Sequence, residues 1–446
     1  MTTSNPDPRE SGHGAKAGED DQPIDMRRLF PIVLIIFTNI LGAGVILPIL
    51  PLYAEGVFKG TVIQITLLST AFFGAQFLAA PWLGRLSDRL GRRPVLILSQ
   101  AGTVAAFILF IFAESLGRSI DSLGLALPLT GGMVMLFVAR ILDGITGGNI
   151  TAAQAYISDV TTDRQRAQGL GLIQAAFGAG FIFGPAFGGL LSGYGSVAPF
   201  IGATVITTGT LMLTIFTLKE SLPAEERAQT GDQGKRSPGV PLGVIISQRG
   251  LMLLLLIEFF VSLAFSAIPS TFALYASQVL FAGPSTAGRA QLYIGLMLTF
   301  SGMMTVITQL ALLRPLVKRF SEQRLLILGQ VSLMIALLGI SLAGTALLVT
   351  ALLAPFSFGQ GVSEPSLQSL VTRFGVRRMR GQLLGLYQSS RSLALIIGPI
   401  WAGFAFQNIG PRTVFSVGAG LVLVALAFAL VLRGQPVPEM GAHEGA

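Results

Sequence analysis

Twelve long apolar stretches, separated by short polar segments, dominate the pattern of the chain. They lie near residues 29–53, 62–83, 95–116, 131–157, 168–193 and 197–218, and then near 249–274, 290–312, 325–345, 346–371, 382–406 and 413–432. A helix of about 20 apolar residues crosses the hydrocarbon core of a bilayer, and each stretch is long enough to do so. The pattern therefore predicts an all-α membrane protein with twelve transmembrane helices.

A polar segment divides the chain near its middle. It is charged and rich in Gly and Pro, as a linker between two bundles should be. We predict a disordered cytoplasmic tail over 1–26, an N-terminal six-helix bundle over 27–219, a cytoplasmic linker over 220–248, a C-terminal six-helix bundle over 249–433 and a second cytoplasmic tail over 434–446.

An internal repeat supports this division. The run QGLGLIQ at 168–174, followed by Gly184-Pro185, returns at the same spacing as QLLGLYQ at 382–388, followed by Gly398-Pro399. Two related halves indicate a pseudo-symmetric pair of six-helix bundles with a binding site at their interface, near the middle of the bilayer.

Composition agrees with a membrane protein and narrows its chemistry. Hydrophobic residues make up 52% of the chain and charged residues only 12%, about half of what a soluble protein carries. There is no Cys, and both His residues, His13 and His443, lie in the polar tails. Proton chemistry within the membrane must therefore use carboxylates. Because a nucleophile with a base and a set of metal ligands are both missing from the apolar stretches, we do not expect an enzyme.

The basic residues predict the orientation of the chain, because cytoplasmic connections carry an excess of Lys and Arg. One set of connections carries Arg85, Arg89, Arg92, Arg93, Arg164, Arg166, Lys219, Arg227, Lys235, Arg236, Arg249, Arg314, Lys318, Arg319, Arg324, Arg373, Arg377, Arg378 and Arg380. The other set carries Lys59, Arg118, Arg289 and Arg412. We expect a multi-pass protein of the cell (inner) membrane with both termini cytoplasmic. This bias also accounts for most of the net charge of +8, so nucleic-acid binding is not needed to explain it.

The connection after the second stretch reads GRLSDRLGRRP from Gly84 to Pro94. Asp88 can pair with Arg92 one helical turn away. One interpretation is a basic loop that only sets topology. The run nevertheless resembles the signature loop of the major facilitator superfamily at Gly84, Asp88, Arg89, Gly91, Arg92 and Arg93. This resemblance implies the major facilitator fold, and it implies that Asp88 holds the cytoplasmic side shut against residues 380–382.

A second run, GFIFGPAFGG, lies in the fifth apolar stretch. Its small residues permit close helix packing, which alone could explain it. The run also resembles the motif of the superfamily's antiporter branches at Gly180, Gly184, Pro185, Gly188 and Gly189. The first half as a whole is similar to tetracycline efflux proteins of the twelve-helix drug:proton antiporter family. One departure is Asn39, which stands where many relatives have an acidic residue and which cannot carry a proton.

Five charges lie deep in the apolar stretches. They are Arg140, Asp143, Glu258, Glu364 and Arg391. Two arginines cannot neutralise three carboxylates, so at least one carboxylate is left to bind a proton. We favour Glu258, because it lies among apolar residues near the bilayer centre, with Asp143 and Glu364 as alternatives. The alternative for Glu258 itself is a purely structural pair with Arg391. Candidate polar groups of a substrate cavity are Asn39, Arg140, Asn149, Gln174, Gln388 and Arg391.

The resemblance implies a secondary active transporter that exports a small amphipathic compound, a drug or tetracycline-like molecule, in exchange for protons by alternating access. Its partners would be the substrate, protons and the lipid bilayer. It would use the proton gradient as its energy source, with no cofactor and no metal, and we expect a monomer. The alternatives are an uptake symporter or uniporter for a small solute and, third, a non-transporting receptor or scaffold.

Overall fold

The computed structural model describes residues 26–124, 128–161, 163–222, 248–374 and 379–434. Within these residues the chain forms helices and no β-strand, and twelve helical segments are long and apolar enough to cross a membrane. The predicted fold class is therefore confirmed. Residues 1–25 and 435–446 of the predicted tails and residues 223–247 of the predicted linker lie outside the described residues.

Seven α-helices come from the first half of the chain. They are α1 (Met26–Phe58), α2 (Val62–Leu90), α3 (Arg92–Ser122), α4 (Gly131–Thr146), α5 (Asn149–Val160), α6 (Asp163–Leu191) and α7 (Ala198–Thr217). A short 3₁₀ turn, η1 (Ser192–Tyr194), follows α6. The fourth span contains both α4 and α5, because the helix is interrupted at Gly147 and Gly148.

The second half has more interruptions. Its α-helices are α10 (Arg249–Phe265), α11 (Ala267–Tyr275), α12 (Pro284–Ala287), α13 (Ala290–Ile307), α14 (Leu313–Arg319), α15 (Glu322–Leu342), α16 (Ala346–Thr372), α17 (Arg380–Asn408) and α18 (Thr413–Arg433). Two π-helical segments, η2 (Ala276–Leu280) and η3 (Thr308–Leu312), continue the seventh and eighth spans.

Several helices extend beyond the apolar stretches that predicted them. The stretch 62–83 becomes a helix that runs to Leu90, and the next helix already begins at Arg92. Hydropathy predicts only the part of a helix that lies in lipid, whereas backbone hydrogen bonding continues into the polar residues beyond it. The predicted connection is thus mostly helical. Gly91 makes the turn with φ of 103°, a left-handed backbone that suits glycine.

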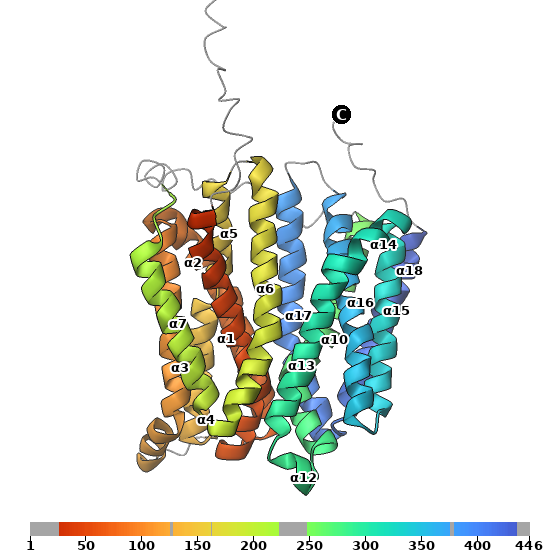
Figure 1. Cartoon of the computed structure of the whole chain (residues 1–446). Coiled ribbons are helices and arrows are strands. Elements are labelled where there is room, and N and C mark those ends of the chain that lie inside the picture. The colour runs from red at the N-terminus through yellow and green to blue at the C-terminus, as the bar shows by residue number, and fades with distance from the viewer. Residues whose placement is uncertain (1–25, 125–127, 162, 223–247, 375–378, 435–446) are drawn as a thin grey trace, which may run out of the picture.

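The two chain halves lie side by side (Figure 1), and α1 begins at the same end of the molecule at which α18 ends. We call this the termini end, and the other end, where α12 lies, the opposite end. The main helix pairs that join the halves are α2 with α17, α6 with α13, and α1 with α11.

Buried aromatic residues pack each half internally toward the opposite end. In the first half, Phe110 of α3 stacks on Phe200 of α7 with ring centroids 5.2 Å apart. In the second half, Tyr275 of α11 meets Phe415 of α18 edge to face at 4.7 Å. All four rings are almost fully buried. Such pairs add to the apolar burial of large rings and stabilise each half.

Candidate functional site

A small pocket lies between α10, α16 and α17 in the second half. It is lined by Glu258, Val261, Ser262, Phe265, Gln360, Ser363, Glu364, Leu367 and Arg391. Three of the five deep charges predicted from the sequence therefore meet in one place, although they come from three separate helices. Apolar and ionisable side chains thus form the walls of this pocket together.

Glu258 is the most buried charged side chain of the pocket, with 2% of the residue exposed. Its Oε1 accepts a hydrogen bond from the Ser262 hydroxyl, one helical turn along α10, at 2.6 Å. Tyr387 of α17 is fully buried beside it, with a hydroxyl group that makes no hydrogen bond of normal geometry. Hydroxyl groups, rather than a salt-bridging cation, are thus the contacts of this carboxylate.

Arg391 forms its ion pair with Glu364 and not with Glu258. Both partners of this pair are partly accessible, with 28% of the Arg391 side chain and 36% of the Glu364 side chain exposed. The salt bridge between Glu258 and Arg391, which was the structural alternative for Glu258, is therefore replaced by the pair of Arg391 with Glu364. Of the two carboxylates in the pocket, Glu364 has an ion-pair partner, and Glu258 has none among the described residues.

The remaining two deep charges pair with each other in the first half. Arg140 Nη1 lies 3.0 Å from Asp143 Oδ2, and both residues are buried. The guanidinium group also lies over the ring of Phe72 in α2, 4.1 Å from its centroid. A cation between a carboxylate and an aromatic face is well stabilised in a dry environment. Asp143 thus has a dedicated counter-ion, which sets it apart from Glu258.

The other predicted cavity residues lie outside the pocket lining. Asn39 is half-buried on α1, whereas Gln174 on α6 and Gln388 on α17 are exposed. Asn149 is the first residue of α5, and its side chain lies outside the described part of the structure.

The two halves contact each other toward the opposite end. The Ile63 N–H donates to Gln407 Oε1 at 3.1 Å, and the Thr70 hydroxyl donates to the Ile396 carbonyl at 3.0 Å. Between α6 and α13, the Thr299 hydroxyl donates to the Ile182 carbonyl at 3.0 Å. Within η2, Gln278 Nε2 donates to Glu55 Oε1 of α1 at 2.6 Å. These bonds close the interface at this end.

The same helices face open space toward the termini end. A Cβ atom added at Gly171 of α6, or at Gly381 or Gly385 of α17, would meet no atom within 4 Å. Gln174 and Gln388, one turn further along, are exposed. Among the described residues, hydrogen bonds thus close the interface at the opposite end, whereas these positions of α6 and α17 are uncovered toward the termini end.

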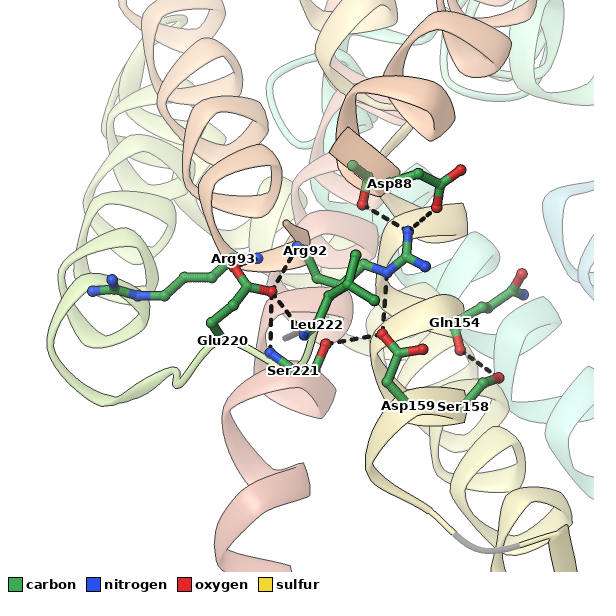
Figure 2. A network of polar contacts seen from close by, with 10 residues as sticks. Asp88, Arg92, Arg93, Gln154, Ser158, Asp159, Glu220, Ser221 and Leu222 are labelled. Atoms are coloured by element: carbon green, nitrogen blue, oxygen red, sulfur yellow. Dashed lines mark hydrogen bonds and ion pairs between the residues drawn. The ribbon is translucent and has the colours of Figure 1, made fainter. Parts of the chain in front are cut away.

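The predicted loop from Gly84 to Pro94 anchors a polar network (Figure 2). Arg92 Nη1 lies 2.5 Å from Asp88 Oδ1, and Arg92 Nε lies 3.1 Å from Asp159 Oδ2 on α5. The Glu220 carboxylate accepts hydrogen bonds from the Arg92 and Arg93 N–H groups. The expected pair of Asp88 and Arg92 is therefore present, and Arg92 links α2, α3 and α5.

The run from Gly180 to Gly189 is a close-packing seam on α6. A Cβ at Gly184 would lie 2.7 Å from the Gly44 Cα of α1, closer than real Cβ contacts come. A Cβ at Gly189 would lie 3.0 Å from the Gln291 carbonyl oxygen at the start of α13. The seam thus packs α6 against α1 of the same half and against α13 of the second half.

Comparison with known proteins decides the family. The sequence matches the Major Facilitator Superfamily over residues 32–394 and 284–446. The chain belongs to this superfamily. It is a multi-pass membrane transporter of small molecules, not an enzyme.

Relatives within the major facilitator superfamily cover nearly the whole chain. The class D tetracycline resistance protein of Salmonella ordonez is 30% identical over 411 residues, which are 91% of this chain and 97% of that protein. Multidrug resistance protein 2 of Bacillus subtilis (strain 168) is 28% identical over 411 residues, 90% of this chain and 96% of that protein. The crystal structure of the human organic anion transporter MFSD10 (TETRAN) shares the fold, with a TM-score of 0.63 and 23% sequence identity. The match covers 92% of this chain and 100% of that chain.

Sequence reasoning missed several residues around the site of this major facilitator protein. Ser262, Gln360 and Ser363 line the pocket, and Tyr387 lies beside Glu258. Helical spacing could have indicated Ser262, which follows Glu258 by four residues and so shares its face. The others come from different helices, and no local pattern connects them to Glu258.

Proposed function

We propose that this transporter is a proton-coupled antiporter that exports a small amphipathic compound, a drug or tetracycline-like molecule, by alternating access. The observation that carries the proposal is the burial of Glu258 with no salt-bridge partner among the described residues, at the wall of a pocket that also holds an ion pair. A buried carboxylate of this kind is costly when ionised and marks a proton or substrate pathway in membrane proteins. The names of the tetracycline and multidrug resistance relatives support export of such compounds.

The proposed arrangement has two rocking bundles, residues 27–219 and 249–433, joined by the linker 220–248. The excess of Lys and Arg in connections at the termini end supports a cytoplasmic location for that end, in the inner membrane of a bacterium. Both bundles belong to one chain, so a monomer is sufficient for the cycle. With this orientation, the interface is open to the cytoplasm and closed to the outside, which is the state that takes up a substrate for export.

The proton flux and the substrate flux are coupled if a proton on Glu258 and the substrate cannot be bound at the same time. Protonated Glu258 is neutral and stable in its buried position, whereas the ionised form needs donors or a cation. A proton that enters from outside is then released toward the cytoplasm, and substrate binding replaces it. Ser262 holds the carboxylate in place for this exchange.

Everted membrane vesicles from an efflux-deficient host test the proposal. A growth-inhibition screen with the expressed chain, beginning with tetracycline, first selects the compound. The compound should then collapse a respiration-generated pH gradient and accumulate in vesicles that contain the wild-type protein. Glu258→Gln should lose this gradient-driven accumulation, because its neutral side chain mimics the protonated form, which excludes the compound, and because it has no proton to release.

The matched control is Glu114→Gln, because Glu114 is an exposed carboxylate that pairs with Arg118 on the surface of α3. It should behave like the wild type. Entry of the compound down its own gradient, without proton movement, would defeat the proposal of antiport and favour a uniporter. Compound uptake together with protons would favour a symporter.

A further inference from the structure

Three ionisable side chains share the pocket in the second half, with two acidic groups against one basic group. Glu258 comes from α10, Glu364 from α16 and Arg391 from α17. Arg391 is paired with Glu364, and its charge is also within electrostatic range of Glu258. A guanidinium group has five N–H donors, enough to serve either carboxylate. One cation therefore lies within reach of two possible partners.

The two carboxylates differ in how well they tolerate the loss of that cation. The Glu364 side chain is 36% exposed, so water can solvate it when it is unpaired. Glu258 is 2% exposed, and an ionised carboxylate in such a position carries a large desolvation penalty unless a cation or several donors approach it. When Glu258 loses its proton, the arrangement of lowest free energy is therefore the one in which Arg391 forms an ion pair with the buried Glu258 carboxylate.

We infer that Arg391 is a positioning residue that exchanges partners: it pairs with Glu364 while Glu258 is protonated, and it moves to Glu258 when the proton leaves. This inference rests on the proposed function, in which Glu258 carries the proton. The proton leaves Glu258 for water at the open termini end, and Arg391 stays charged throughout. The pocket gains one negative charge, which resides on Glu364 at its more accessible side.

The surroundings of Glu258 can stabilise its ionised form, the state in which Arg391 pairs with it. Ser262 already donates to the carboxylate, and the buried Tyr387 hydroxyl lies beside it. Two other helices, α11 and α18, also pack on α10. Among their described residues, the charged side chain of α18 is Arg433 at its end, and the ionisable Tyr275 of α11 packs against Phe415. Arg391 is thus the cation available to the ionised Glu258 carboxylate.

Infrared titration of the purified protein in lipid tests the exchange without any substrate. The carbonyl band of protonated Glu258 is assigned by its loss in Glu258→Gln, and its midpoint pH is then compared among variants. Glu364→Gln leaves Arg391 free to serve Glu258 at all times, so the midpoint should fall by about one pH unit, a tenfold change in proton affinity. Arg391→Gln should raise the midpoint, and Arg391→Lys should restore it in part.

The matched control is Glu322→Gln, which removes the carboxylate of another ion pair in the second half, with Arg373 at 2.8 Å. It should leave the midpoint unchanged. If Glu258 titrates but Glu364→Gln does not shift its midpoint, or shifts it no more than Glu322→Gln does, the exchange is wrong and the proposed function stands. If Glu258 of the wild-type protein does not titrate at all near neutral pH, the proposed function fails with it.

Discussion

Glu220 caps the α3 helix at Arg92. Its Oε1 accepts a hydrogen bond from the Arg92 N–H at 2.8 Å, and its Oε2 accepts one from the Arg93 N–H at 3.2 Å. The N–H groups of a first helical turn have no partner within the helix, and a carboxylate there also interacts favourably with the helix dipole. The chain directly after α7 is thereby fixed to the loop that connects α2 with α3.

Removal of this cap should destabilise the protein by a measurable amount. We expect Glu220→Ala to lower the free energy of unfolding by about 1 kcal/mol, the usual value for a lost helix cap. The measurement is thermal unfolding in detergent. Glu114→Ala is the control on the same helix, because its pair with Arg118 is exposed and contributes little. Equal effects of the two substitutions would contradict the capping role.

The sequence predicted the twelve spans well, because hydropathy over about 20 residues reports directly on the bilayer. It also predicted contacts between residues that are close in the chain. Asp88 and Arg92 are one helical turn apart, and they form an ion pair. Glu220 and Asp159 were not connected with that loop, since their contacts with Arg92 join residues that are distant in the chain. Only the packing of α3, α5 and the segment after α7 brings them together.

The buried pair of Arg140 and Asp143 gives a second prediction. Asp143→Asn leaves Arg140 charged and buried without its carboxylate, which costs about 3–5 kcal/mol when one partner of a buried ion pair is removed. The double variant Arg140→Gln with Asp143→Asn removes both charges and should unfold at a higher temperature than Asp143→Asn alone. A double variant that is less stable than the single variant would show that the two charges do not depend on each other.

The same limits apply to the charges of the pocket. Counting the deep charges indicated that one carboxylate has no arginine partner, and the sequence favoured Glu258. The sequence did not show which carboxylate Arg391 contacts, because the three residues lie on three different helices and spacing within a helix does not report contacts between helices. The pairing depends on how α10, α16 and α17 pack, and this packing places Arg391 on Glu364.

The glycine seam on α6 gives a third prediction, with an internal control on the same helix. Gly184→Ala places a methyl group against the backbone of Gly44, so α1 and α6 must move apart, at a cost of about 1–3 kcal/mol. Gly171→Ala places the same methyl group in open space and should leave stability unchanged or slightly raised, since Ala favours a helix. Thermal unfolding of both variants measures the difference. If Gly171→Ala were as harmful as Gly184→Ala, the loss could not be assigned to the seam.

The hydrogen bond between Glu55 and Gln278 gives the last prediction, because it crosses the closed end of the interface. Alternating access requires α1 and η2 to separate there during each cycle. The chain contains no Cys, so Glu55→Cys with Gln278→Cys introduces the only two thiols. A short crosslinker with two methanethiosulfonate ends should join them through two disulfides, with methanesulfinate as the leaving group, and should stop transport in vesicles. Reduction of the disulfides should restore transport. The two single variants, treated with the same reagent, should continue to transport. Full transport by the completely crosslinked double variant would mean that this end does not open, and the proposed cycle would then be wrong.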